Sequence, residues 1–239
     1  MLLFAVPLSA AKRYSVLVYH GANPPYSYEE EGLTKGLFAD IFAYISSITG
    51  LQFEFVPLSV ARGHRMFEQG KVDIEPGVNP LWRQESSNPG LYSRFYAYSR
   101  EVVLARSKLI HTMPESLYGQ VIGRVRGYRY GAFEQHFGEQ KIMPYDNVSE
   151  RELLAQLAHK RFDYIMIGDI TAAYYRHSHA EYRAFQEVYE ISCLPVAMRI
   201  QPTQPELKAA IDQALEQMIK SGALAAIYSK YGALLRVPD

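Results

Sequence analysis

The sequence predicts an α/β protein built from two lobes that the chain joins twice. Three observations support this prediction. Apolar strand-like runs alternate with amphipathic helical stretches over residues 14–78, the alternation restarts over residues 121–176, and a long apolar run at residues 189–200 precedes two terminal helices. Strands and helices alternating at these lengths indicate parallel sheets with right-handed crossovers. A second α/β unit followed by one strand and terminal helices is expected of a chain that returns to complete its first lobe.

The first lobe begins with a strand at residues 14–19 (YSVLVY), which the loop Asn23-Pro24-Pro25 ends because a double proline is incompatible with helix. Gly36 precedes an amphipathic helix that stops near Gly50. The remaining elements expected in this lobe are a strand at 51–56, a short helix at 62–69, a strand at 72–75 and a β-rich run at 99–107.

The second lobe repeats the pattern from residue 108. Ser149 precedes a helix at residues 151–159 with the side chain expected of an N-cap. The other elements are strands at 121–125, 141–145 and 162–167 and helices at 132–137 and 170–176, followed by the return strand at 189–200 and helices at 205–220 and 223–231. We therefore predict a first lobe of residues 12–107 and 197–239 and a second lobe of residues 108–196.

The composition favours recognition of a small molecule. The 239 residues include 25 basic and 25 acidic side chains, so no net charge recruits nucleic acid or an anionic membrane. Nineteen tyrosines, 11 phenylalanines and one tryptophan supply aromatic surface with polar handles. The alternative is that these aromatic residues form an ordinary core.

Metal and disulfide chemistry is not expected. Cys193 is the single cysteine, which excludes an internal disulfide and a cysteine-based zinc site. The seven histidines lack a helical HExxH spacing, and His177 and His179 beside Arg176 are typical of a solvated helix end. We expect no cofactor and no metal.

Residues 1–11 (MLLFAVPLSAA) resemble the end of a secretory signal that lacks its basic leader, with Ser9-Ala10-Ala11 as the cleavage site. A buried first strand is the alternative, against which Pro7 argues. No other run is long and apolar enough for a membrane span, so export would deliver a soluble protein.

A candidate anion site follows the strand at residues 72–75. Gly77 lets a ligand approach the backbone, Asn79 offers a donor and an acceptor, and Arg83 presents a planar fork that suits a carboxylate. The alternative is a strand, a turn and a surface arginine.

Together these segments resemble the bacterial periplasmic solute-binding proteins of the polar-amino-acid type (extracellular solute-binding proteins, family 3), which have a two-lobed type II periplasmic binding fold with two crossover strands. The resemblance covers nearly the whole chain after the signal segment. The matching pieces are Pro24-Pro25-Tyr26-Ser27-Tyr28, Gly36 to Asp40, Gly70 to Asp73, Gly77 with Arg83, Tyr92 to Tyr96, Gly123 to Gly127, Leu153 to Asp163, Ile167-Gly168-Asp169 and Leu207 to Tyr231.

The resemblance implies ligand-binding roles for individual residues. Arg83 would grip the ligand carboxylate, with Gly77 and Asn79 beside it, and Asp169 of the second lobe would receive the ligand's ammonium group. The further candidates are His20 and Tyr26 in the first loop, Arg126, Gly127 and Tyr128 at a helix start in the second lobe, and Arg62 and Trp82, which could equally pack on the first lobe.

Several departures from the family pattern bear on the ligand. The turn that carries Arg83 is one residue short, and Tyr128 stands where a small hydroxyl residue is common. The arginines that could gather near one cleft indicate a ligand more acidic than a neutral amino acid, or not an amino acid at all; they are Arg62, Arg83, Arg94, Arg126 and Arg129.

The implied function is extracytoplasmic capture of a small carboxylate-bearing solute, an amino acid or related compound, by a monomer that passes it to an ABC-transporter permease complex. Two alternatives stay open: a periplasmic sensor or receptor domain with no transport role, and a cyclohexadienyl-dehydratase-like enzyme. The enzyme would need a general-acid glutamate just after Asp169, and residues 169–174 (DITAAY) contain none. We therefore expect a binding protein, with no catalytic residues.

Overall fold

The computed structural model describes residues 12–19, 23–107 and 114–238. The expected signal remnant at residues 1–11 and the candidate ligand residue His20 lie outside these ranges. Among the described residues, the helices are too short or too polar to span a bilayer.

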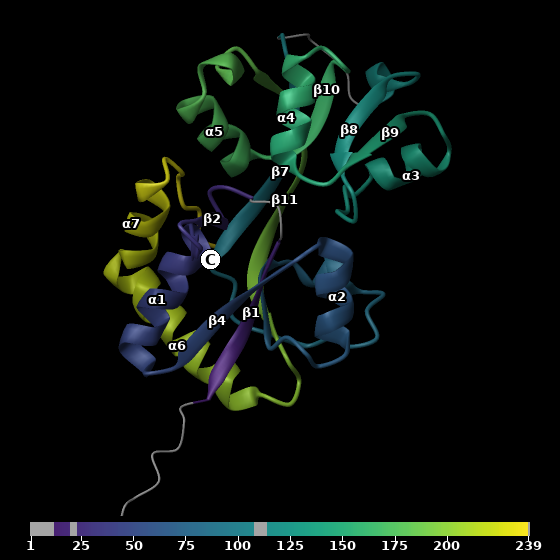
Figure 1. Ribbon diagram of the computed structural model, residues 1–239. Helices are drawn as coiled ribbons and strands as arrows, with labels where there is room; N and C mark the ends of the chain where they lie inside the picture. Colours follow the sequence, from purple (N-terminus) through teal and green to yellow (C-terminus); the bar gives the residue numbers. More distant parts are fainter. Residues whose placement is uncertain (1–11, 20–22, 108–113, 239) are drawn as a thin grey trace, which may run out of the picture.

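The first lobe is an α/β unit formed by both ends of the described chain (Figure 1). It contains β1 (Arg13–Tyr19), β2 (Tyr28–Glu30), β3 (Leu33–Lys35), α1 (Leu37–Thr49), β4 (Gln52–Leu58), α2 (Val60–Glu68), β5 (Ile74–Val78), the 3-10 turn Pro80–Arg83, β6 (Leu91–Tyr92), α6 (Pro205–Ser221) and α7 (Ala223–Lys230).

The second lobe is a smaller α/β unit that the middle of the chain forms. It contains the 3-10 turn Glu115–Leu117, β8 (Val121–Val125), α3 (Phe133–Gly138), β9 (Met143–Asn147), α4 (Glu150–Ala158), β10 (Tyr164–Gly168), α5 (Asp169–Ser178) and the 3-10 turn Ala180–Tyr182.

Two long antiparallel strands connect the lobes, β7 (Ala97–Ala105) and β11 (Gln186–Ile200). They pair with each other along most of their length, while the end of β11 pairs with β5 and the end of β7 pairs with β10. The strand order is β4-β1-β5-β11-β7-β10-β8-β9, so β11 and β7 form the centre of the sheet and both lobes extend from them. The predicted two-lobed fold with two crossover strands is confirmed.

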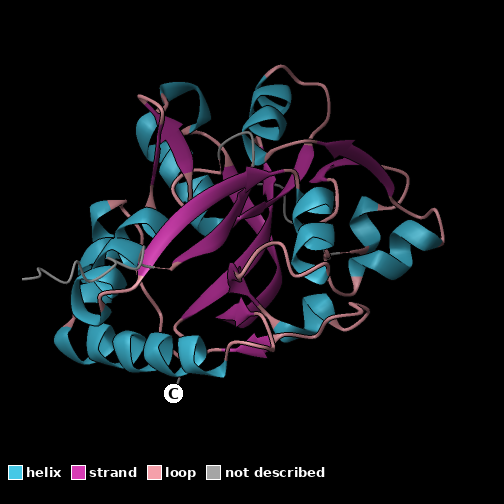
Figure 2. Ribbon diagram, turned by 60° about the horizontal axis from the view of Figure 1, so that its bottom comes forward, coloured by secondary structure: helices cyan, strands magenta, loops and turns pink. Residues whose placement is uncertain are grey.

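Each lobe has its own apolar core, and helices cover the strands on several sides (Figure 2). The first core includes Ile41 of α1, Ile74 of β5 and Leu215 of α6. Val102 and Leu104 of β7 belong to a second-lobe core, so β7 changes lobes before residue 105. The predicted boundaries at residues 107 and 196 stay predictions.

Most sequence-predicted elements match those observed, with ends shifted by a few residues. The β2–β3 hairpin was not predicted, although Glu31 and Gly32 at its turn both have positive φ angles, of 54° and 75°. A glutamate at such a position carries no strong turn signal, since Asn, Asp and Gly are the residues that typically mark it.

Gly36 connects the first loop to α1 through a contact that leaves no room for a side chain. Its φ is 115°, and a Cβ there would lie 2.6 Å from the carbonyl oxygen of Pro25 and 2.7 Å from that of Tyr26. Leu37 N and Phe38 N donate to these same oxygens at 2.8 and 3.0 Å, so this junction fixes the position of the Tyr26 loop.

Gly36→Ala is therefore expected to lower the free energy of unfolding by about 2–4 kcal/mol, because it adds a backbone clash to an unfavourable φ. Gly50→Ala is the matched control, since Gly50 also has a positive φ but nothing lies within 4 Å of its added Cβ. That substitution should cost only about 1–2 kcal/mol. Urea denaturation compares the two, and equal losses would show that the junction at Gly36 is not tight.

Candidate functional site

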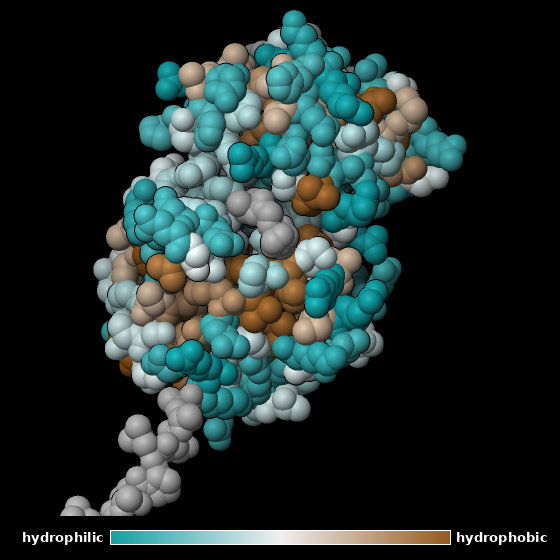
Figure 3. Space-filling model, viewed as in Figure 1, coloured by the Kyte–Doolittle hydropathy of each residue, from teal (hydrophilic) through white to brown (hydrophobic). Residues whose placement is uncertain are grey.

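A cavity of about 120 Å³ lies between the lobes. It is formed where β1 and β5 of the first lobe and β8 and β10 of the second lobe end, which is the usual location of ligand sites in sheets of this kind. Its aromatic lining residues include Tyr19, Tyr26, Phe38, Trp82, Tyr98 and Tyr128. In Figure 3, the visible face of the molecule is mostly hydrophilic, and its largest apolar patch lies on the first lobe.

The loop before Tyr26 lies on the first-lobe side of the cavity. Asn23 and Ser27 close this loop through two backbone hydrogen bonds of 2.8 and 3.1 Å, and Tyr26 packs on Phe38 of α1 with ring centroids 5.5 Å apart. Burial raises the pKa of Tyr26 well above its ordinary value. The double proline thus presents Tyr26 to the cavity as the sequence predicted, although its contact with a ligand stays a prediction.

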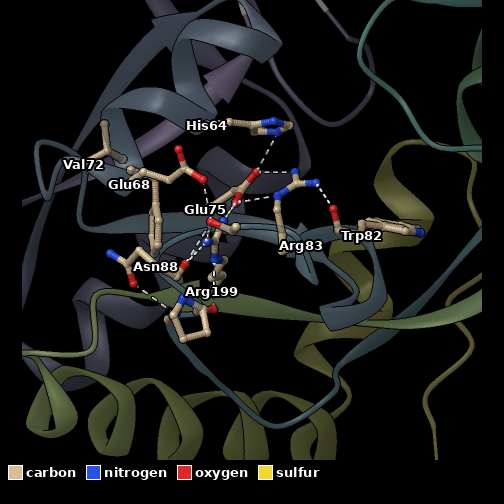
Figure 4. Close-up of polar contacts among 12 residues, drawn as sticks. His64, Glu68, Val72, Glu75, Trp82, Arg83, Asn88 and Arg199 are labelled. Carbon is tan, nitrogen blue, oxygen red and sulfur yellow. Dashed lines mark hydrogen bonds and ion pairs between the residues drawn. The ribbon is translucent and has the colours of Figure 1, made fainter.

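Arg83 lines the cavity, but its guanidinium already binds a carboxylate of the protein. Nη2 and Nε donate to the two oxygens of Glu75 at 2.5 and 3.2 Å, and Nη1 donates to the carbonyl oxygen of Trp82 (Figure 4). Nη2 also donates to the hydroxyl of Tyr19 at 3.3 Å. A guanidinium has five N–H donors. The contacts within the described residues therefore leave Arg83 little capacity for a ligand.

Glu75 also binds Arg199 of β11, which is fully buried. Nη1 of Arg199 lies 3.0 Å from Glu75 Oε2, and its Nη2 donates to Ser86 and Asn88. The guanidinium stacks over the ring of Phe67, 4.1 Å from the centroid. Two arginines thus share one carboxylate, a group that we call the Glu75 cluster.

The charges of this cluster shift its pKa values in opposite directions. Burial would raise the pKa of the Glu75 carboxyl, but the hydrogen bond from His64 and the charge of Arg83 outweigh burial and hold it well below its usual range. Burial opposes the charge of Arg83, whereas Tyr19 and Glu75 raise its pKa. Glu75 and Arg83 therefore both carry full charges at neutral pH.

Two other carboxyl groups line the cavity, and neither forms an ion pair with another residue that the structure describes. Glu101 lies on β7 and Glu150 is the first residue of α4, with only 5% of its surface exposed. Oε1 of Glu150 accepts a hydrogen bond of 2.8 Å from Gly168 N, and no described residue donates a hydrogen bond to the Oε2 atom of either glutamate. Burial raises the pKa of Glu150 to about 7, and burial and the neighbouring Glu150 raise that of Glu101 well above its usual range.

Asp169, the predicted ammonium receptor, is not among the residues that line the cavity. One carboxylate oxygen accepts from Ile170 N at 2.7 Å, and the other lies 3.5 Å from Nη1 of Arg100. Arg100 also pairs with Glu187 and Glu190 at 2.8 and 2.5 Å. Burial raises the pKa of Asp169.

The other predicted site residues fall into two groups. Gly77, Trp82, Gly127 and Tyr128 line the cavity together with Tyr26 and Arg83. Asn79 does not; its side chain is buried in bonds to Pro195 O and Leu81 N. Arg62 and Arg126 are exposed and absent from the lining, and so is Arg94, which pairs with Glu216.

Side chains of the two lobes meet across the cavity. The amide of Asn23 donates to the Tyr128 hydroxyl at 3.4 Å and accepts from the Thr171 hydroxyl at 3.5 Å. Arg129 of the second lobe pairs with Glu85 of the first lobe at 3.0 Å. These contacts bring the lobes together over the cavity, as in the closed form of a hinged protein.

The sequence reasoning missed Glu75, Glu101 and Glu150. Glu75 carried one signal, because it is a charged residue inside an otherwise apolar strand and therefore needs a buried partner. Glu150 carries no comparable signal, because a glutamate just after an N-cap is common on a solvated helix face. No group of His, Cys, Asp and Glu within the described ranges has the arrangement of a metal site.

Comparison with known proteins agrees with this geometry. A model of the bacterial extracellular solute-binding proteins, family 3, matches residues 16–233. A search of the curated proteins found no match.

Three solved structures show the same fold. An ancestral arginine-binding protein bound to arginine is 21% identical, with a TM-score of 0.76, covering 92% of this chain and 97% of that chain. The arginine-, lysine-, histidine-binding protein ArtJ from Geobacillus stearothermophilus is 20% identical, with a TM-score of 0.75 and coverages of 94% and 97%. A histidine kinase sensor domain with similarity to periplasmic binding proteins is 17% identical, with a TM-score of 0.79 and coverages of 95% and 98%.

Proposed function

Because the chain belongs to the bacterial extracellular solute-binding proteins, family 3, we propose that it captures a small organic solute in the cavity between its lobes. The solute is a carboxylate-bearing compound, an amino acid or a relative. The protein acts as a monomer in the periplasm and hands the solute to an ABC-transporter permease. We expect it to bind no cofactor and to catalyse no reaction.

The observation that supports this proposal is the composition of the cavity wall. Both lobes contribute aromatic rings, and each contributes charge: the Glu75 cluster in the first lobe and Glu150 in the second. The cluster holds two arginines and one glutamate, so its charge is positive, while the opposite wall carries carboxyl groups. A zwitterion between these walls stabilises the closed state, since it interacts with both lobes only when they are together.

The ligand carboxylate is expected on the Arg83 side of the cavity. Gly77 and Trp82 border that side, and one N–H of Arg83 Nη1 has no acceptor among the described residues. A single such contact beside a net positive cluster favours a carboxylate without the bidentate grip that the sequence suggested.

A thermal-shift screen with amino acids, dicarboxylates and small aromatic acids tests this function. A ligand at about 1,000 times its dissociation constant adds about 4 kcal/mol to the stability of the folded state. For a chain of this length, that gain raises Tm by roughly 8–16 °C.

Ser99→Trp and Ser87→Trp form a matched pair for the same screen. Ser99 lines the cavity, whereas Ser87 is exposed and outside it, so only the first variant should lose the shift. A screen in which no solute stabilises the wild type, or in which both variants respond alike, would exclude the cavity as the binding site.

A dehydratase-like enzyme is the second candidate, and Glu150 is the observation that favours it. A buried carboxyl whose pKa is near 7 is protonated often enough at neutral pH to act as a general acid. Incubation with prephenate decides between the two, because release of phenylpyruvate would establish catalysis. We expect none.

A sensor or receptor role without transport uses the same cavity and the same hinge. The similarity to the histidine kinase sensor domain supports this version of the proposal. A pull-down with the permease encoded nearest to the gene separates the two roles, since only uptake requires that complex.

A further inference from the structure

We propose that Glu101 and Glu150 together bind the ligand's cationic group, at a site that we call the seat. The cationic group carries N–H donors. In the unliganded protein the seat holds a proton, which the ligand's cation displaces. The inference rests on the proposed function and specifies the substrate class: a primary ammonium or a guanidinium compound. Asp169, to which the family resemblance gives this role, does not line the cavity.

The sheet brings the two carboxyl groups to one point. Glu101 of β7 lies opposite Gly168 of β10 in the antiparallel register, and Glu150 accepts a hydrogen bond from Gly168 N. A methyl group at Gly168 would lie 3.5 Å from Glu150 Oε1 and 4.0 Å from Glu101 Oε1. All three residues line the cavity. The two carboxyl groups, which are 49 positions apart in the sequence, therefore approach the cavity side by side.

The unpartnered oxygen atoms indicate what the seat binds. Both oxygens of Glu75 receive hydrogen bonds from arginines, whereas Oε2 of Glu101 and Oε2 of Glu150 receive none from residues 12–19, 23–107 and 114–238. A buried oxygen without a donor is costly, and a ligand that supplies one recovers that cost. A primary ammonium brings three N–H donors and a guanidinium brings up to five, whereas a trimethylammonium brings none.

No cation of the protein can fill this role within the described residues. Neither Glu101 nor Glu150 takes part in an ion pair, and the nearby Arg100 is held by Asp169, Glu187 and Glu190. The other polar and charged groups that face the seat are Asp169, Thr171 and Tyr175 from α5, Tyr128 and Tyr130 from the loop after β8, and Tyr26 from the first lobe.

These surroundings explain why the empty seat keeps a proton. Two adjacent buried carboxyl groups cannot both ionise at low cost, and Asp169 adds a third negative charge. Hydrogen bonds from Gly168 N and Thr171 favour the ionised form of Glu150 but do not outweigh burial. When the cation binds, the O–H bond of the protonated carboxyl breaks, the proton passes to solvent, and the carboxylate pairs with the ligand.

The experiment has one part that needs no ligand. Carbon-13 NMR of glutamate side-chain carboxyl groups, recorded from pH 4 to pH 9, should show a carboxyl that titrates near neutrality in the wild type and is missing in Glu150→Gln. Full ionisation of every glutamate by pH 6 would overturn the proposal.

The second part uses matched probes. L-phenylalanine is compared with phenethylamine, 3-phenylpropionate and N,N,N-trimethyl-L-phenylalanine, and L-arginine is compared with agmatine and 5-guanidinopentanoate. Probes with a cationic group that bears N–H donors should bind. 3-Phenylpropionate, which has no cation, and the trimethylated compound, whose cation has no N–H, should not bind. Calorimetry in phosphate and in Tris should show proton release on binding at pH 6.

Glu101→Gln and Glu150→Gln should each weaken the binding of these cations by roughly 10- to 100-fold. Glu152→Gln, on the exposed face of the same helix, is the control and should leave affinity unchanged. Equal affinity in all three variants, or equal binding of the trimethylated compound, would refute the seat while leaving the binding function intact. Failure of every probe and every solute of the screen would instead refute the proposed function, and the NMR titration would still decide whether the seat holds a proton.

Discussion

Glu75→Ala is expected to lower the free energy of unfolding by about 3–5 kcal/mol, because it leaves buried charges without a counterion. Arg199 is 0% exposed and Glu75 is 1% exposed, so water cannot take the place of the lost carboxylate. Arg83, whose side chain is 10% exposed, loses its partner in the same substitution. Urea denaturation with tryptophan and tyrosine fluorescence measures the change.

Glu85→Ala is the matched control for this prediction. Glu85 pairs with Arg129, but its side chain is 87% exposed, and surface pairs of this kind contribute little. The expected loss for the control is therefore within about 1 kcal/mol. A loss for Glu75→Ala as small as that of Glu85→Ala would show that the Glu75 cluster is solvated and does not stabilise the first lobe.

The unliganded protein is expected to become less stable as the pH rises from about 5 to about 8. Folding raises the pKa of Glu150 from its ordinary 4.5 to about 7. The folded state therefore binds a proton more tightly than the unfolded state, and the stability this contributes is complete below the unfolded pKa and is lost as the pH passes the folded pKa. At about 1.4 kcal/mol per pKa unit, the contribution amounts to roughly 3 kcal/mol.

Glu150→Gln isolates this effect, because glutamine keeps the size of the side chain and cannot ionise. Denaturation curves of the wild type and the variant should converge near pH 5 and separate by pH 8, with the variant the more stable at high pH. Parallel pH profiles would mean that Glu150 is ionised in the folded state, and the shared-proton seat would then be wrong.

Local patterns in the sequence predicted most of the helices and strands of the fold. The apolar run at residues 14–19, Gly36 and the cap at Ser149 each predict an element that the structure contains, because strand, helix and turn preferences depend on neighbouring residues. The return strand β11 was also foreseen, since a second α/β unit followed by one more strand leaves few alternatives.

The charges of the site could be predicted only in part. Glu75 and Arg199 are separated by 124 positions, and nothing local to either residue indicates the other. Arg83 was therefore expected to be free for a ligand, whereas the structure pairs it with Glu75. That pairing depends on strand order, which brings β11 next to β5.

Asp169 and Glu150 show the same limit at the second lobe. Each is the first residue of a helix, α5 and α4, so the sequence presents them as equivalent. Arg100, from the crossover strand β7, holds Asp169, while Glu150 turns inward against Gly168. Tertiary contacts decide which of the two carboxyl groups lines the cavity, and the periodicity of the sequence does not reveal such contacts.

The central claim is that a ligand binds between the two lobes, and the most direct measurement is a crystal structure with the most strongly stabilising solute of the screen. The expected result is ligand density inside the cavity, with its cationic nitrogen within hydrogen-bonding distance of Glu101 and Glu150 and its other end toward Arg83. Density for the ligand outside the cavity, with the space between the lobes unoccupied at saturating ligand, would contradict the account.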